Sequence, residues 1–169
     1  WQPVYLKAWT RSTICSASVI TNEIHDDKAD LFFEACIDAD KEHSIRLQLF
    51  HEEKKILDKN IDLVVGKNYY SFPFEVLNPK LWYPNELGEQ NFYTFNLKML
   101  DDENIIEERN ITMGIRTVEM IEEPDSIGTA FYFKVNGIPL YMKGANYIPE
   151  EMITSWMSKE KTKKLLEQC

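Results

Sequence analysis

Apolar and polar residues alternate in short runs along most of the first 117 residues. In residues 31–37, for example, every second side chain from Leu31 onward is apolar. Such alternation predicts β-strands with one face on a core and the other toward water. Polar turn segments separate the runs. The predicted strands cover residues 13–20, 31–37, 44–50, 61–65, 69–76, 91–100 and 105–117.

About seven short strands at this spacing predict an all-β fold, an immunoglobulin-like antiparallel sandwich over residues 13–120. Its core is expected to contain Phe33, Leu47, Phe72 and Phe95. The aromatic stretch 81–85, Leu-Trp-Tyr-Pro-Asn, does not alternate. We interpret it as a loop that packs at a domain boundary rather than as a platform for a sugar.

The cysteines do not suggest a disulfide. Cys15 is predicted on the apolar face of its strand and Cys36 on the opposite face of its own, so the two are poorly placed to pair. Cys169 completes an odd set without CxxC spacing. We predict three free thiols.

The pattern changes near residue 120. Residues 122–128 are predicted to be a polar linker, and residues 130–143 a hairpin around Asn136-Gly137, the pair that a type I′ turn requires. Ser158 is a good N-cap for a helix over residues 159–168. A strand followed by a helix is half of a βα unit, which needs parallel strands as partners.

The net charge of −9 argues against nucleic acid or an anionic membrane surface as a partner. No apolar run approaches the roughly 18 residues of a membrane span. The sequence has no phosphate loop and no nucleophile elbow, and no cofactor is predicted.

Paired glutamates are frequent, but neighbours on a strand point to opposite faces, so a pair such as Glu107-Glu108 is predicted to be solvated surface. His25, His43 and His51 lack metal-ligand spacing, and no metal site is predicted.

Five motifs occur in a fixed order along the chain. They are Trp1-Gln-Pro-Val-Tyr-Leu6, Asn78-Pro-Lys-Leu-Trp-Tyr-Pro-Asn85, Leu87-Gly-Glu-Gln90, Gly114-Ile-Arg-Thr-Val118 and Val135-Asn-Gly-Ile-Pro-Leu-Tyr-Met-Lys-Gly-Ala-Asn-Tyr-Ile-Pro149. The set resembles glycoside hydrolase family 2, and most closely its β-mannosidase branch. The Gly-Ile-Arg and Lys-Gly-Ala-Asn motifs carry most of this resemblance.

The resemblance implies a jelly roll, then an immunoglobulin-like sandwich, then a (β/α)8 barrel. Residues 1–12 would be the end of the jelly roll or a linker, residues 13–120 the sandwich, and residues 121–169 a linker, hairpin and first βα unit of a truncated barrel. Family members hydrolyse β-linked sugars with retention, and the parent enzyme would act on terminal β-D-mannosides. Their two catalytic glutamates lie on later barrel strands, beyond Cys169, so we expect this fragment to be inactive.

The resemblance also implies substrate contacts at the end of the first barrel strand, and we expect Asn146, Tyr147 and Glu151 to bind the sugar. The β-mannosidase pattern usually has Trp at position 147 and Ala-Asp at positions 150 and 151, and this departure relaxes the expected specificity. The implied partners are a carbohydrate substrate and, within the parent protein, the barrel and the jelly roll. A periplasmic, secreted or lysosomal location would suit the family.

Two other interpretations remain open. One is a standalone immunoglobulin-like module for carbohydrate binding or adhesion. Such a module would not require the hairpin at residues 130–143 or the strand and helix that follow the sandwich. The other is a β-galactosidase or β-glucuronidase relative. Those enzymes usually carry a basic or His-rich run after the Gly-x-Asn, and this sequence has none there.

Overall fold

The computed structural model describes residues 4–144, 146–149 and 151–168. The chain divides into two compact units, one formed by Trp9–Tyr141 and the other by the described residues among 1–8 and 142–169.

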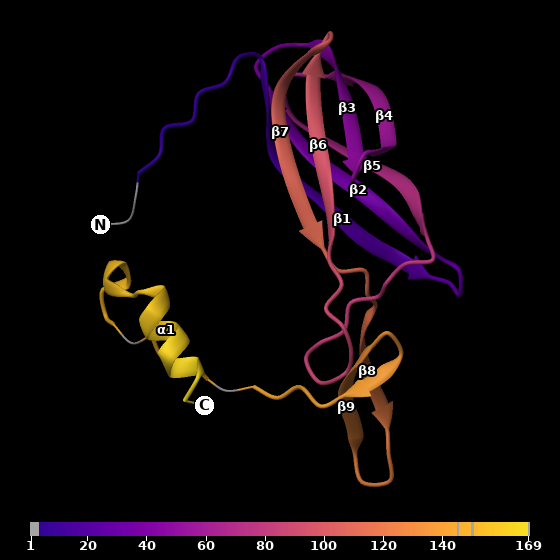
Figure 1. The fold of residues 1–169 in the computed structure, drawn as a ribbon, viewed down its shortest axis with the longest axis vertical. Helices are drawn as coiled ribbons and strands as arrows, with labels where there is room; N and C mark the ends of the chain where they lie inside the picture. Colours follow the sequence, from indigo (N-terminus) through magenta and orange to yellow (C-terminus); the bar gives the residue numbers. More distant parts are fainter. Residues whose placement is uncertain (1–3, 145, 150, 169) are drawn as a thin grey trace. The chain divides into compact units, whose positions relative to one another are not determined.

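The sandwich of the first unit contains seven antiparallel strands in two sheets (Figure 1). One sheet has the order β1-β2-β5 and the other the order β4-β3-β6-β7. The bounds are β1 (Ser12–Ile24), β2 (Lys28–Ala39), β3 (His43–His51), β4 (Lys54–Leu63), β5 (Gly66–Leu77), β6 (Tyr93–Asp101) and β7 (Asn104–Met113). This arrangement confirms the predicted all-β sandwich. Its fourth strand pairs with β3 rather than with β5, unlike the fourth strand of an antibody constant domain.

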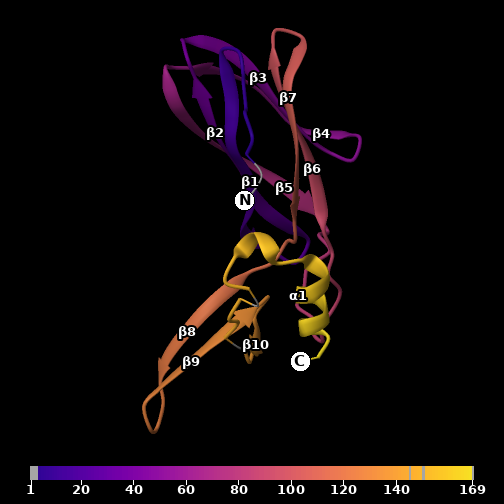
Figure 2. The ribbon, with the colours of Figure 1, turned by 90° about the vertical axis from the view of Figure 1, so that its left-hand side faces the viewer.

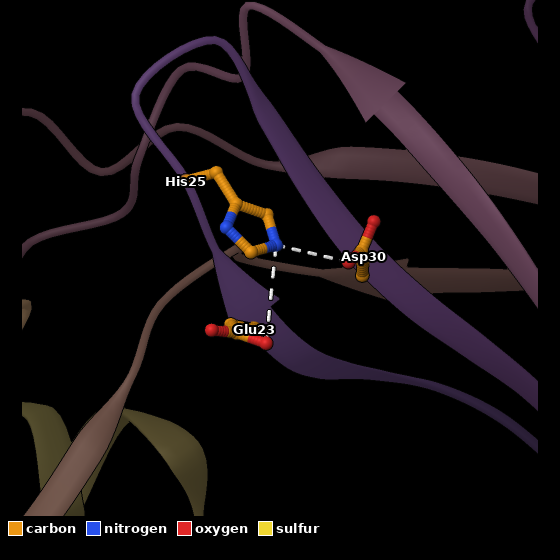
Figure 3. A group of neighbouring side chains, drawn as sticks. All are labelled: Glu23, His25 and Asp30. Carbon is orange, nitrogen blue, oxygen red and sulfur yellow. Dashed lines mark hydrogen bonds and ion pairs between the residues drawn. The ribbon is translucent and has the colours of Figure 1, made fainter.

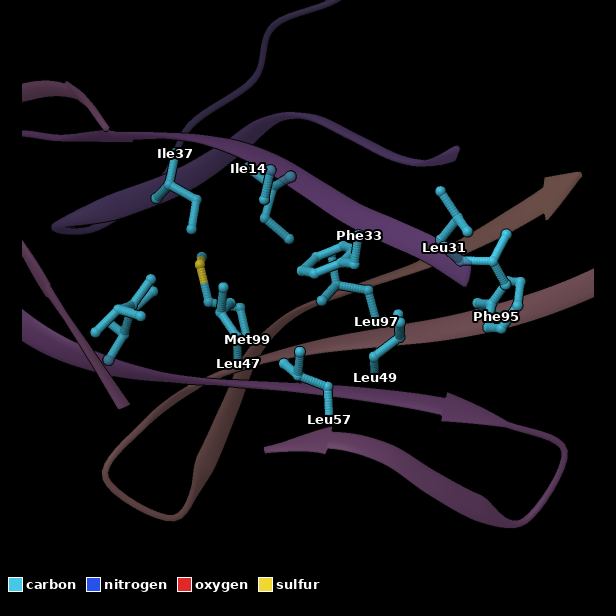
Figure 4. Close-up of a cluster of buried hydrophobic side chains, with 14 of the residues drawn as sticks. Ile14, Leu31, Phe33, Ile37, Leu47, Leu49, Leu57, Phe95, Leu97 and Met99 are labelled. Atoms are coloured by element: carbon cyan, nitrogen blue, oxygen red, sulfur yellow. The ribbon is translucent and has the colours of Figure 1, made fainter. Parts of the chain in front are cut away.

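The core lies between the two sheets and is apolar throughout (Figure 4). Phe33 of the first sheet meets Leu47 and Phe95 of the second, and all three side chains have no exposed surface. Phe72 was expected to be equally buried, but it lies at the margin, partly exposed, with its ring centroid 6.5 Å from that of Phe33. The period-two pattern therefore identified the inward face of β5 correctly, but it predicted a deeper burial of Phe72 than the structure has.

The edge strand β4 begins at Lys54, well before the predicted start at residue 61. Only Leu57, Ile61 and Leu63 of this strand are buried. An edge strand pairs with one neighbour only, and charged residues are common on such strands. Because residues 54–60 are mostly polar, the alternation pattern did not predict the first half of β4.

The position of Cys15 contradicts the prediction that it faces the core. The register of β1 against β2 shifts between Ile14 and Ser16, so an extra residue enters β1 there. Ile14 is buried and Ala17 packs against the core, while Cys15 between them is exposed. Cys15 and Cys36 are both free thiols. Cys169 lies outside the described residues.

A small sheet of order β10-β9-β8 follows the sandwich (Figure 2). It consists of β8 (Val118–Pro124), β9 (Thr129–Val135) and β10 (Ile138–Leu140). The predicted linker at 122–128 is wrong in its first three residues, which belong to β8. The turn that remains is closed by Asp125, whose Oδ1 accepts hydrogen bonds from the backbone N–H groups of Ile127 and Gly128.

The turn between β9 and β10 confirms the prediction from the sequence. Asn136 and Gly137 have φ angles of 49° and 74°, the left-handed values that a type I′ turn needs at both central residues. The hairpin is shorter than the predicted 130–143, because β10 ends at Leu140.

The second unit contains a 3-10 turn (Thr154–Trp156) and the helix α1 (Lys159–Leu166). Ser158 caps α1 as predicted, and its side chain accepts a hydrogen bond from the backbone N–H of Lys161 at 3.2 Å. Every residue of α1 is at least partly exposed. No helix among the described residues is long and apolar enough to cross a membrane.

Candidate functional site

The residues predicted to bind a sugar lie in the second unit. Asn146 is exposed, and Tyr147 has 48% of its surface exposed. Glu151 forms an ion pair with Lys161 of α1, with Nζ 2.7 Å from Oε1. That carboxylate would have to leave the ammonium group, or share it, to accept a hydrogen bond from a sugar hydroxyl. The sugar contacts of these three residues remain a prediction.

In the first unit, three of the sequence motifs converge on Trp82, which lies in the loop between β5 and β6. The backbone N–H of Trp82 donates a hydrogen bond to the carbonyl of Ile115 at 2.9 Å. The guanidinium of Arg116 lies over the indole, 4.6 Å from the ring centroid, in a cation–π contact. We call Trp82, its neighbours and Asn136 the Trp82 joint; its members are Trp82, Gly114, Ile115, Arg116, Thr117 and Asn136.

Gly114 packs directly against Trp82. A Cβ atom at this position would lie 2.6 Å from Cβ and Cγ of Trp82, a distance that real Cβ atoms do not tolerate. Ile115 next to it is fully buried, and Arg116 turns back over the ring. Each residue of the Gly-Ile-Arg motif therefore has a separate contact that explains its identity.

Asn136 connects the Trp82 joint to the β9–β10 turn. Its backbone N–H donates to the carbonyl of Thr117 at 3.1 Å, and its Oδ1 accepts from the Thr117 N–H at 2.9 Å. Its Nδ2 donates to the carbonyl of Trp82 at 3.0 Å. The side chain that permits the left-handed turn conformation thus also holds the turn against the other two motifs.

The geometry of the Trp82 joint is that of a packed support. Neutral hydrogen bonds and one cation–π contact connect its members, and none of these groups is an acid or a base near neutral pH. The Nε1 atom of Trp82 is buried without a hydrogen-bond partner, which carries a free-energy cost that the surrounding packing must offset. Trp82 of the aromatic loop therefore packs against other elements of the first unit. That the loop lies at a domain boundary stays a prediction.

Glu107 is also structural. Its Oε2 accepts hydrogen bonds from the Ile14 N–H and the Thr13 hydroxyl, each at 2.9 Å, and its Oε1 lies 2.7 Å from Arg109. Burial alone would raise the pKa of Glu107, but the Ile14 N–H, Arg109 and Thr13 together lower it. The carboxylate therefore stays ionised and joins β7 to β1. Its neighbour Glu108 is bound separately by Asn96 at 2.7 Å.

A third group, Glu23, His25 and Asp30, flanks the turn between β1 and β2 (Figure 3). His25 Nε2 lies 3.0 Å from Asp30 Oδ2 and 3.9 Å from Glu23 Oε2. The hydrogen bond from His25 is the main cause that lowers the pKa of Asp30. Lys28 already places its ammonium 3.3 Å from Asp30 Oδ1, so a metal ion would compete with a resident cation. No spacing pattern in the sequence indicated this group, because a turn separates its members.

The sequence profile described as glycosyl hydrolases family 2 matches residues 14–116, which span the seven strands of the sandwich and the Gly-Ile-Arg motif. The chain belongs to glycosyl hydrolase family 2. The predicted family resemblance is therefore confirmed.

Several curated relatives of this family-2 chain are β-mannosidases. Beta-mannosidase B of Emericella nidulans is 32% identical over 94 residues, which cover 56% of this chain. Beta-mannosidase B of Aspergillus terreus is 31% identical over 94 residues, with the same coverage. The chain spans only 11% of the length of each of these relatives.

Among solved structures, a β-D-mannosidase from Dictyoglomus thermophilum matches 96% of this chain and 20% of its own, with a TM-score of 0.81 and 29% identity. The exo-chitosanase CsxA from Amycolatopsis orientalis matches 82% of this chain and 16% of its own, with a TM-score of 0.67 and 23% identity. The second likeness is one of fold alone.

Proposed function

We propose that this chain is the non-catalytic sandwich region of a retaining, exo-acting β-mannosidase that hydrolyses terminal β-D-mannosides. The observation that carries the proposal is the match to the Dictyoglomus thermophilum β-D-mannosidase. It extends over 96% of the chain at 29% identity, and so includes the segment after the sandwich as well as the sandwich itself.

The sandwich's own contacts favour a supporting role. A retaining glycosidase needs two carboxyl groups about 5 Å apart that are free to reach the scissile bond. Glu107 instead has both oxygens engaged within the sandwich, and Asp58 is bound by Arg46 and Lys55. The Trp82 joint fixes the small sheet at Asn136, and so sets the point from which the chain continues past Leu140. We infer that the sandwich supports the catalytic domain and that the catalytic glutamates lie outside these 169 residues.

The first test is hydrolysis by the chain itself. Purified chain incubated with 4-nitrophenyl β-D-mannoside should release no nitrophenol above a buffer blank, because the carboxylates that supply most of the rate in such enzymes are missing. Turnover that survives a second purification and scales with chain concentration would contradict the non-catalytic role.

The second test concerns the substrate of a longer protein that contains this sequence. That protein should have a higher kcat/KM for 4-nitrophenyl β-D-mannoside than for the matching β-D-galactoside or β-D-glucuronide. A preference for the galactoside or glucuronide would replace the β-mannosidase assignment with another branch of the family. No turnover of any β-glycoside would favour a binding or adhesion module.

The proposed sugar contacts can be tested in the same longer protein. Asn146, Tyr147 and Glu151 are proposed to bind the substrate, and an aromatic ring stacked on a sugar contributes through its area. Tyr147→Ala should therefore raise KM or lower kcat/KM several-fold. Tyr69→Ala, which truncates a side chain of β5 that is 75% exposed on the sandwich and far along the chain from these residues, is the matched control and should change neither.

A further inference from the structure

Cys15 and Cys36 lie on the same face of the first sheet, contrary to the expectation from the sequence. Cys36 pairs with Ser16 in the register of β1 against β2, and Ile37 pairs with Ile14. Cys15 is the extra residue between these two pairs. Ile14 and Ile37 both point into the core, so Cys15 and Cys36 both belong to the outer face. The bulge therefore brings one thiol beside the other across adjacent strands.

The two thiols are close enough to influence each other's ionisation. Partial desolvation is the main cause that raises the pKa of Cys15, and the charge of a Cys36 thiolate and a hydrogen bond between the two side chains raise it further. Cys15 directly precedes Ser16, the residue opposite Cys36 in the register. Residues opposite each other in an antiparallel pair have Cα atoms about 4.5–5.5 Å apart, so the bulge places the Cys15 backbone next to a pair whose spacing a disulfide can span.

The two thiols differ in access. Cys15 is exposed, whereas Cys36 has only 8% of its surface exposed. Cys36 lines a shallow depression on the outer face of the sheet together with Tyr69 and Tyr70 of β5. A small oxidant can therefore reach Cys15 directly, while Cys36 is placed to attack the Cys15 sulfur once Cys15 has formed a mixed disulfide with the oxidant.

We propose that Cys15 and Cys36 are a redox-active pair that closes to a cross-strand disulfide with a small-molecule disulfide, such as oxidised glutathione, as the oxidant. The Cys15 thiolate attacks one sulfur of the oxidant, whose S–S bond breaks and releases one thiol. The Cys36 thiolate then attacks the Cys15 sulfur of the mixed disulfide and releases the second thiol. The protein loses two electrons and two protons, and the oxidant is reduced to two thiols.

The disulfide would join the edge strand β1 to β2 beside the bulge. Closing a loop of about 20 residues restricts the unfolded chain, so the oxidised protein should unfold at a higher temperature than the reduced one. Thiol–disulfide exchange requires the thiolate, so a thiol of raised pKa reacts slowly at neutral pH. Its rate should rise up to about tenfold for each unit by which the pH is raised above neutral, as long as the pH stays below the pKa of the thiol.

The test uses the full chain with Cys169→Ser, which leaves the two thiols in question. The protein is incubated at pH 8 with oxidised glutathione, the remaining thiols are alkylated, and the peptides are identified by mass spectrometry. We expect a cross-link between the Cys15 and Cys36 peptides with the loss of two hydrogen atoms, reversed by dithiothreitol. The Tm of the oxidised protein should rise by several degrees.

Two controls make the result decisive. Cys15→Ser replaces an exposed side chain, so it should fold normally, form no internal disulfide and leave Cys36 largely unreacted. In the chain that retains Cys169, oxidation under native conditions should give the Cys15–Cys36 link, whereas oxidation in concentrated urea should give mixed pairings. A stable glutathione adduct on Cys15 with Cys36 still open to alkylation would overturn the proposal. A native Cys15–Cys169 link would overturn it as well.

Discussion

The sandwich and the helix α1 differ in how completely they bury their apolar side chains. The sandwich buries large residues from both of its sheets completely, among them Phe33, Leu47 and Phe95. The second unit buries no residue of α1 and leaves Trp156 64% and Leu166 68% exposed. An isolated helix of eight residues is marginal in water. The comparison indicates that the sandwich stabilises itself, whereas α1 needs an apolar surface from elsewhere to cover it.

The largest expected effect is on the sandwich core. Phe95→Ala should reduce the free energy of unfolding by about 3–5 kcal/mol, because it removes a fully buried ring and leaves a cavity. Phe72→Ala should cost less, because that ring is already partly exposed. Leu166→Ala should leave the urea midpoint unchanged. Equal midpoints for Phe95→Ala and Leu166→Ala would remove the distinction between the two units.

The next effect is on the Trp82 joint. Gly114→Ala should destabilise the protein by about 1–3 kcal/mol, because the new methyl group overlaps the indole at 2.6 Å and forces it to move. Displacement of the ring should also shift the tryptophan fluorescence. Gly128→Ala is the matched control, since nothing lies within 4 Å of its Cβ position. If the two variants were equally stable, Gly114 would not be held by packing against Trp82.

The smallest expected effect is the pH dependence of the ion pair between β3 and β4. Hydrogen bonds from Arg46, with help from Lys55, lower the pKa of Asp58 from 3.8 to about 2. The stabilisation is therefore fully present above the unfolded pKa near 4 and is lost as pH falls toward 2. Water around this partly exposed pair limits the contribution to about 1 kcal/mol.

The contribution of Asp58 can be isolated by comparison with Asp58→Asn. Stability measured by urea unfolding between pH 6 and pH 2 should fall less steeply in the variant than in the unmodified chain. Parallel curves would mean that the folded and unfolded states bind protons at Asp58 equally.

The sequence predicted most of the sandwich, because period-two alternation reports directly which side chains face a core. It missed the first half of β4, where an edge strand is polar, and it placed a linker over the end of β8. It also placed Cys15 on the wrong face, because one residue inserted at a bulge reverses the alternation and leaves no local mark.

The contacts of the Trp82 joint were beyond sequence reasoning for a different reason. The motifs were visible, but the bond from Asn136 to the Trp82 carbonyl joins residues 54 positions apart. Only the folded chain shows that the aromatic loop, the Gly-Ile-Arg motif and the Asn-Gly turn contact one another. The sugar-contact role of Asn146, Tyr147 and Glu151 stays a prediction, since it depends on partners outside the described residues.

Amide hydrogen exchange on the monomeric chain tests the central distinction most directly. Amides in β2 and β6 should exchange only through global unfolding, because the strands lie inside a packed sandwich. Amides in α1 should exchange many orders of magnitude faster, through local opening of a helix with no buried residue. Protection of α1 equal to that of β2 and β6, at a concentration where the chain is monomeric, would contradict the account and show that the second unit is stable by itself.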